Sequence, residues 1–290
     1  MPRTIEQGFA DFHNSIKASA AEASATVSHR ASIKACLESN FGLKRFTRIG
    51  SFGNGTNISG YSDVDYLACL PTASLKQSST YTLGLVKDAL NARFPNTGVH
   101  VNTPAVVCPF GIYKSQHTEI VVVDYIKEKN GYKIYEMADS NGGWMEICPD
   151  AHNLYVHAVD KKHSGKVKPL IQFVKAWKYY RSVPISSFYL EMRVAKYADG
   201  EAAIIYDIDV ERILAMLSDN ELAIMQDPTG MAGYIYPCKT DAFKQDALSK
   251  LKTAAIRAEK ARSRTLNNDI KEAFDWWRLL YNDKFPNYYL

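Results

Sequence analysis

Two aspartates separated by one residue stand at the start of an apolar segment. Asp63 and Asp65 lead into the run from Tyr66 to Leu70, which is typical of a buried strand. Alternate residues of a strand point to the same face, so the two carboxylates are expected roughly 6–7 Å apart along the backbone. Carboxylates this close repel each other and are costly to bury without a partner. Divalent cations would resolve the conflict, and two such ions are the usual device for phosphoryl transfer.

A Gly-Ser step lies upstream of this pair. Gly50-Ser51 follows a short expected strand from Arg45 to Ile49, and residues 51–60 are rich in Gly, Asn, Ser and Thr, which predicts a turn. Small residues with available backbone N–H groups and a hydroxyl can hold phosphate oxygens. A D-x-D pair alone could be an exposed strand edge, but the Gly-Ser turn before it and the apolar strand after it favour a nucleotide site.

This pattern resembles the nucleotidyltransferase superfamily of DNA polymerase β, whose signature is G-S, then D-x-D, then a third carboxylate on a later strand. We assign the third carboxylate to Asp124, which follows the β-branched run from Ile120 to Val123. Such a run is typical of a strand buried on both faces. The alternative is a strand-end aspartate with no chemical role. Glu119 has the opposite parity to Asp124, so we expect it to be structural or solvated.

The surrounding elements predict an α/β fold, a polymerase β-like mixed sheet followed by a helical C-terminal lobe. Apolar periodicity predicts one or two helices between residues 5 and 40 and another from 81 to 94, with strands at 99–107 and 118–126. Helices are expected from Pro169, from Phe188, at 210–217 and through most of 241–281. We therefore predict two domains, at 1–168 and 169–290, with the active site in the cleft between them.

Composition sets limits on the function. The chain has 290 residues, 46% of them hydrophobic, and a net charge of +4, which is weak for a protein that binds long nucleic acids. The five cysteines form no C-x-x-C pair, as expected of reduced thiols in the cytoplasm. No apolar run approaches the length of a membrane span. We predict a cytoplasmic enzyme that does not bind membranes.

The order of later motifs resembles one group more closely, the bacterial cGAS/DncV-like nucleotidyltransferases (CD-NTases). Features of this group are found from Gly50 to the C-terminus. Beyond the superfamily residues they are Thr56, Gly143-Trp144, Pro149, His152, Lys175-Ala176-Trp177-Lys178, Pro184 to Phe188, Asp227-Pro228 and Phe285-Pro286. The K-x-W-K and P-I-x-S-F motifs and the late Asp227-Pro228 are the most particular of these.

The resemblance implies a metal-dependent enzyme that makes a cyclic di- or trinucleotide from NTPs in anti-phage signalling. Asp63, Asp65 and Asp124 would hold two Mg²⁺ (or Mn²⁺) ions. Asp124 would also help to deprotonate the attacking ribose hydroxyl. A product-sensing effector protein is the implied partner.

The same resemblance implies the nucleotide-binding residues. Gly50 and Ser51 would hold the donor triphosphate together with Lys175 and Ser187, while Phe188 would stack on a base. Each of the last three also has a plain structural interpretation. Lys175 could lie on a solvated helix face, Ser187 could be an N-cap, and Phe188 could belong to the core.

Three rival functions fit the same fold. One is a template-independent RNA or tRNA nucleotidyltransferase, another modifies an antibiotic or a protein, and a third would be an inactive nucleotide-binding regulator. The inserted zinc ribbon of animal cyclic GMP–AMP synthase has no counterpart here, so a double-stranded nucleic acid activator is not indicated. The basic stretch from Arg257 to Arg264 is interpreted as the solvated side of a helix.

Overall fold

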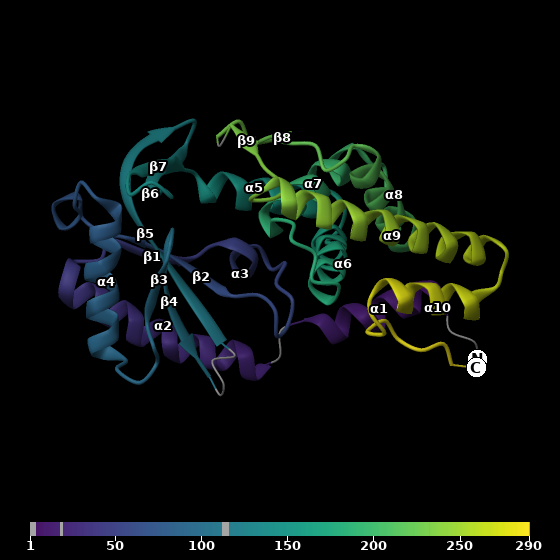
Figure 1. Cartoon of the computed structure of the whole chain (residues 1–290), viewed down its shortest axis with the longest axis horizontal. Coiled ribbons are helices and arrows are strands. Elements are labelled where there is room, and N and C mark those ends of the chain that lie inside the picture. Colours follow the sequence, from purple (N-terminus) through teal and green to yellow (C-terminus); the bar gives the residue numbers. More distant parts are fainter. Residues whose placement is uncertain (1–3, 18–19, 112–115, 232, 290) are drawn as a thin grey trace. The chain divides into compact units, whose positions relative to one another are not determined.

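The computed structural model describes residues 4–17, 20–111, 116–231 and 233–289. The chain forms two compact units, one from residues 18–154 and one from residues 1–17 together with 155–290 (Figure 1). The division falls within helix α5 (Pro149–Lys162). The two domains expected at 1–168 and 169–290 stay a prediction, because compactness alone does not show which segments fold independently.

The unit of residues 18–154, called the sheet unit below, is built on a seven-stranded mixed sheet, as predicted. Its strands are β1 (Arg45–Arg48), β2 (Val64–Cys69), β3 (His100–Asn102), β4 (Ala105–Phe110), β5 (Gln116–Lys129), β6 (Tyr132–Ala138) and β7 (Trp144–Ile147). The order is β1-β2-β5-β4-β3, and β6 pairs with both β5 and β7. Strands β2 and β5 run parallel, whereas the other pairs are antiparallel.

The two faces of this sheet differ in what covers them. Helices α2 (Ala20–Phe41) and α4 (Ser79–Arg93) pack on the face that carries Tyr66, Ala68, Ile120 and Val122. Leu67, Cys69, Val121 and Val123 form a smaller apolar cluster on the opposite face. Because side chains alternate along a strand, the odd-numbered residues of β2 and of β5 up to Val123 share that second face.

Two predicted segments differ in detail. The expected turn after Gly50 begins with a short helix, α3 (Gly50–Asn54), before the loop; a 3₁₀ turn, η1 (Thr72–Ser74), follows β2. The expected strand 99–107 is divided into β3 and β4 by a turn at Thr103-Pro104. Proline lacks the N–H group that a continuous strand would need at this point.

The second unit, called the helical unit below, consists mainly of helices. They are α1 (Ile5–Ile16), most of α5, α6 (Val167–Tyr180), α7 (Ser187–Gly200), α8 (Tyr206–Asp219), α9 (Asp241–Leu266) and α10 (Ile270–Leu280), with a small hairpin of β8 (Met225–Gln226) and β9 (Tyr234–Ile235). Within the described residues, no helix is long and apolar enough to cross a membrane.

Helix α1 is anchored in the helical unit by aromatic packing. Phe9 is fully buried. Its ring centroid lies 5.0 Å from Phe173, 5.0 Å from Trp277 and 5.2 Å from Phe285. These edge-to-face contacts join the first helix to α6, α10 and the C-terminal segment, so residues far apart in sequence share one core.

Phe9→Ala should therefore lower the free energy of unfolding by about 3–5 kcal/mol, the usual cost of truncating a buried Phe. The exposed Phe243 provides the matched control, because its truncation removes little packing and should change stability by less than about 0.5 kcal/mol. Urea unfolding of both variants measures the difference. Equal losses would contradict the proposed anchoring.

Candidate active site

The predicted D-x-D pair lies where β2 begins. Asp63 immediately precedes the strand and Asp65 is its second residue. Asp63 is exposed, whereas Asp65 is half-buried. The two side chains are on the face that carries Leu67 and Cys69, away from α2 and α4.

The parallel pairing of β2 with β5 places a third carboxylate beside this pair. Asp65 lies directly opposite Glu119 in the register. Partners on neighbouring strands point to the same face of a sheet, so Glu119 accompanies Asp65, and it too is half-buried. His117, two residues earlier on β5, has its Nδ1 3.8 Å from Oδ1 of Asp63. Three carboxylates and one imidazole thus belong to residues at the same end of the β2–β5 pair.

The structure does not bring Asp124 to this group. The register pairs Cys69 with Val123, so Asp124 lies five residues beyond Glu119, or about 16 Å along the strand. It also points to the opposite face, where its Oδ1 accepts a hydrogen bond from Thr72 Oγ1 at 3.0 Å. The sequence alone shows that Glu119 and Asp124 have opposite parity and therefore lie on opposite faces of the strand. The structure shows that Glu119, and not Asp124, shares the face of Asp65.

Gly50 is fitted to Asp65. Its φ angle is +59°, and a Cβ atom at this position would overlap the Asp65 carboxylate. The neighbouring backbone is tied to the same strand, since Ile49 N–H donates to Asp65 O at 3.0 Å. Any residue other than glycine would be strained and would push the carboxylate away. The predicted Gly-Ser turn and the D-x-D strand therefore meet.

Ser51 continues the chain from this contact point. It lies in the first turn of α3, and its backbone oxygen accepts the N–H groups of Gly55 and Thr56. Its side chain is half-buried. The sheet unit thus contains both Gly50-Ser51, which is predicted to bind phosphate, and the carboxylates.

An ion pair braces the strand before Gly50. Arg45 on β1 donates to both carboxylate oxygens of Asp150, at 2.7 and 2.9 Å, and also to the hydroxyl of Tyr135. The hydrogen bond to Asp150 raises the pKa of Arg45. On the carboxylate face, burial and then Asp124 raise the pKa of the Cys69 thiol, so this cysteine is a neutral packing residue.

The donor atoms suit magnesium. Carboxylate oxygens are the ligands that Mg²⁺ prefers, and Asp63, Asp65 and Glu119 offer them from one face. In the part of the chain that the structure describes, no three His, Cys, Asp or Glu side chains already converge into a metal-binding group. The backbone therefore provides the placement, while the side chains would still have to turn together around an ion.

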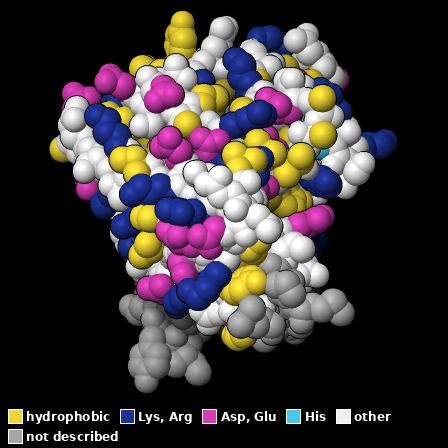
Figure 2. All heavy atoms as spheres, turned by 90° about the vertical axis from the view of Figure 1, so that its right-hand side faces the viewer, with side chains coloured by type: hydrophobic (Ala, Val, Ile, Leu, Met, Phe, Trp, Pro, Cys, Tyr) yellow, Lys and Arg dark blue, Asp and Glu magenta, His cyan; other side chains and the backbone are white. Residues whose placement is uncertain are grey.

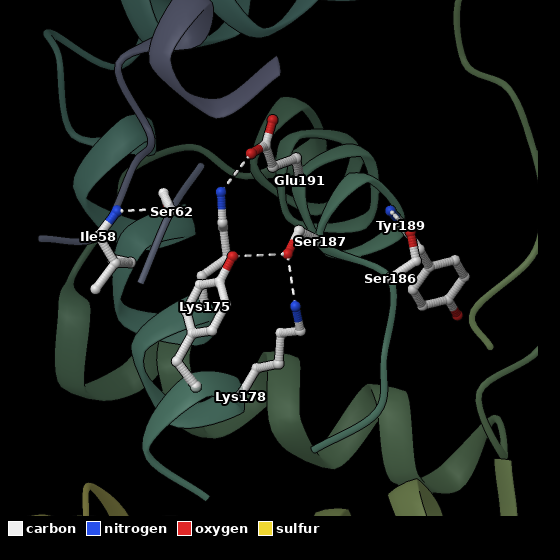
Figure 3. A network of polar contacts seen from close by, with 9 residues as sticks. Ile58, Ser62, Lys175, Lys178, Ser186, Ser187, Tyr189 and Glu191 are labelled. Atoms are coloured by element: carbon white, nitrogen blue, oxygen red, sulfur yellow. Dashed lines mark hydrogen bonds and ion pairs between the residues drawn. The ribbon is translucent and has the colours of Figure 1, made fainter. Parts of the chain in front are cut away.

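The predicted phosphate-binding residues of the helical unit separate into two networks (Figure 3). Lys175 is completely buried, and its Nζ lies 2.6 Å from Oε1 of Glu191. Lys178 instead donates to Ser187 Oγ at 2.7 Å, and Tyr179 OH lies 3.1 Å from the same oxygen. The structure thus brings Ser187 together with Lys178, a lysine to which the resemblance assigns no role, rather than with Lys175.

The first residues of α7 differ in their contacts and exposure. Ser186, not Ser187, is the N-cap, since its side chain accepts the N–H of Tyr189 at 3.3 Å. The Ser187 hydroxyl therefore serves the Lys178 network. Phe188 has an exposed fraction of 39% and so is not a core residue. Lys178, Ser186 and Ser187 line a groove of about 770 Å³ with the exposed Tyr236 and Phe243.

Several solved structures share this architecture. No family model matches the sequence. The chain is similar to E. coli MS115-1 CdnC solved with ATP, with a TM-score of 0.76, 16% identity and coverage of 97% of this chain and 99% of that one. It is also similar to Bradyrhizobium diazoefficiens CdnG, a CD-NTase in complex with GTP, at a TM-score of 0.75 and 13% identity over 98% and 96% of the two chains. The chain has the CD-NTase fold.

Two further likenesses agree. Vibrio cholerae DncV, a cyclic AMP-GMP synthase solved with a linear intermediate, matches with a TM-score of 0.68 and 15% identity over 84% of this chain and 70% of that one. A Bacillus cereus (strain VD146) protein described as a probable cyclic nucleotide synthase is 25% identical over 178 residues. That match covers 58% of this chain and about half, 51%, of the relative.

Within the CD-NTase fold, Glu119 and Asp124 can be distinguished by stability. Glu119→Gln removes a negative charge opposite Asp65 and should raise the free energy of unfolding by up to about 1 kcal/mol in the absence of metal. Asp124→Asn should lower it, because Asp124 is buried and accepts the Thr72 hydrogen bond. Urea unfolding in EDTA gives both values. Stabilisation by Asp124→Asn and destabilisation by Glu119→Gln would contradict this placement.

The two lysines of α6 should also behave differently. Lys175→Ala leaves Glu191 buried without its partner, so it should destabilise the protein by about 3–5 kcal/mol. Lys178→Ala removes one charged hydrogen bond near a groove and should weaken NTP binding roughly tenfold or more while leaving the fold largely intact. Unfolding curves and NTP titrations of both variants provide the measurement. A stable Lys175→Ala protein that has lost NTP binding would return Lys175 to the binding site.

Proposed function

We propose that this protein is a CD-NTase that joins NTPs into a cyclic di- or trinucleotide. The observation that carries the proposal is the placement of Glu119 opposite Asp65, with the Asp65 carboxylate against Gly50. A nucleotide-binding regulator has no need for carboxylates gathered beside a Gly-Ser step. The named neighbours support the substrate class, since CdnC was solved with ATP and CdnG with GTP.

The proposed chemistry assigns roles to the residues of the sheet unit. Asp63, Asp65 and Glu119 would hold two Mg²⁺ ions, which supply charge neutralisation for phosphoryl transfer. Backbone N–H groups near Gly50 and the Ser51 hydroxyl would hold oxygens of the triphosphate. A ribose hydroxyl would then attack the α-phosphorus as the bond to pyrophosphate breaks, and Glu119 would receive the hydroxyl proton. Asp124 keeps no role in this scheme.

The helical unit would bind and orient the nucleotide. Lys178 and Ser187 would hold phosphate oxygens, and Lys175 would support α6 through its pair with Glu191. Phe188 would stack on a base, which every nucleobase permits. The groove beside Ser187 has a volume within the usual range of small-molecule sites.

Cyclisation is proposed over polymerisation because of the surface charge. The net charge is +4, and basic and acidic side chains are interspersed on the face shown in Figure 2. Proteins that track long nucleic acids need a run of cationic contacts. A linear intermediate that turns within the site and reacts again needs no such surface. Anti-phage signalling through a product-sensing effector, in the cytoplasm, completes the proposal.

Product analysis tests the proposed function. The purified protein would be incubated with each NTP and each NTP pair in Mg²⁺, treated with phosphatase and examined by mass spectrometry. We expect a phosphatase-resistant product that has lost one pyrophosphate for every nucleotide incorporated. Asp65→Asn should abolish it, whereas Asp88→Asn, at an exposed position of α4, should not.

Other products would overturn the proposal. Linear chains of growing length would indicate a template-independent polymerase. The same incubation would be repeated with labelled NTPs and an added acceptor. Transfer of the label to RNA would indicate an RNA nucleotidyltransferase, and transfer to an aminoglycoside would indicate an antibiotic-modifying enzyme. Full product formation by Asp65→Asn would remove the carboxylates from the mechanism.

A further inference from the structure

A second cavity lies wholly within the helical unit and is lined by cations. It has a volume of about 320 Å³ between α6 and α9. Arg181, Lys250 and Arg257 line it together with the hydroxyl-bearing Ser249 and Thr253. Trp177 and Ala254 complete the wall. None of these residues takes part in the proposed nucleotidyl transfer.

The guanidinium groups of Arg181 and Arg257 both donate hydrogen bonds to backbone oxygens at the C-terminal end of α10. Arg181 donates through Nε to Leu280 O at 3.1 Å and through Nη2 to Leu279 O. Arg257 donates through Nη1 to Leu279 O at 2.9 Å. The C-terminus of a helix carries partial negative charge that favours cations. The two groups are thus fixed side by side by backbone oxygens rather than by carboxylates.

The charge of this pair is incompletely balanced. Among the described residues, no carboxylate lies within ion-pair distance of Arg181 or Arg257, although Asp283 contributes a favourable field at Arg181. Burial and then the neighbouring Arg257 lower the pKa of Arg181. Lys250 is partly neutralised by Asp246 at 2.7 Å and also donates to Ser182 O at 3.0 Å. The cavity therefore concentrates positive charge.

A guanidinium has five N–H donors in a planar fork, and the contacts to α10 use two of those on Arg181 and one on Arg257. The remaining donors have no acceptor within the described part of the chain. Two adjacent guanidinium forks, an ammonium and the Ser249 hydroxyl match the oxygens of a phosphate dianion, which arginine binds in bidentate fashion. The Thr253 hydroxyl lines the same cavity and donates to Ser249 O at 3.2 Å.

We propose that this cavity binds a phosphate group, either as free orthophosphate or as the phosphate of a small nucleotide. The site is formed by Arg181, Lys250 and Arg257 with the hydroxyl of Ser249, and Thr253 lines its wall. Arg181 follows directly after α6, the helix that carries Lys178. Occupancy of the cavity would therefore fix the end of the helix whose lysine contacts Ser187, which gives the ligand a route to influence nucleotide binding.

Calorimetric titration of the full chain with sodium phosphate tests the proposal. The titration would be made in EDTA, with sodium chloride at matched ionic strength as the control titrant. We expect saturable phosphate binding that chloride does not reproduce. It should persist in Lys178→Ala, which separates this cavity from the phosphate-binding residues of the proposed active site.

Two matched pairs of variants locate the site. Thr253→Glu places a carboxylate in the cavity without touching the contacts to α10, and should weaken phosphate binding at least about tenfold. Ser263→Glu makes a comparable charge change at an exposed position of the same helix and should have little effect. Lys250→Gln should weaken binding about tenfold, whereas Lys252→Gln, also exposed on α9, should not.

A parallel titration with AMP distinguishes the two phosphate sources. Tighter binding of AMP than of orthophosphate, lost in Thr253→Glu, would assign the cavity to a nucleotide. Equal binding would assign it to the free anion. Absence of saturable phosphate binding, or unchanged binding in Thr253→Glu when circular dichroism shows the variant to be folded, would overturn the proposal.

Discussion

The parallel register between β2 and β5 is the constraint on which the candidate site depends. It sets Asp65 opposite Glu119, and strand alternation then puts both carboxylates on the face away from α2 and α4. A shift by one residue would replace Glu119 with Thr118, which has no charge, or with the apolar Ile120. The register is held by the buried residues that follow, because Tyr66, Ala68, Ile120 and Val122 must face the two helices. The core therefore fixes the placement of the two carboxylates at the end of the strands.

The charged residues of the helical unit discussed above form two groups, one buried and one half-buried. Lys175 and Glu191 are both buried and satisfy each other, which is the condition under which buried charge is tolerated. Lys178 and the cations of the second cavity are only half-buried and bind hydroxyl or carbonyl oxygens. Groups of the first kind determine which packing is stable, whereas those of the second kind retain the capacity to bind an anion. The K-x-W-K motif thus contains one residue of each kind.

Sequence patterns predict the positions of helices and strands better than they predict which of these elements lie against each other. The apolar run after Asp63 and the β-branched run before Asp124 are both strands, and the mixed sheet with a helical C-terminal half is confirmed. Periodicity shows which side of a strand is buried, but it does not give the pairing of two strands separated by a helix and a hairpin. That pairing decides between Glu119 and Asp124. The same limit applies to Lys175 and Lys178. Periodicity predicts the buried face of α6, but it does not show which residue of α7 each lysine contacts.

Metal binding tests the central claim most directly. Mn²⁺ would be titrated into the wild-type protein, Glu119→Gln and Asp124→Asn in the presence of a non-hydrolysable ATP analogue, with bound ions counted by electron paramagnetic resonance. The proposed function, with the register of β2 and β5, predicts two bound ions in the wild type and in Asp124→Asn, and loss of at least one ion in Glu119→Gln. Loss of ions in Asp124→Asn with full binding in Glu119→Gln would contradict the account.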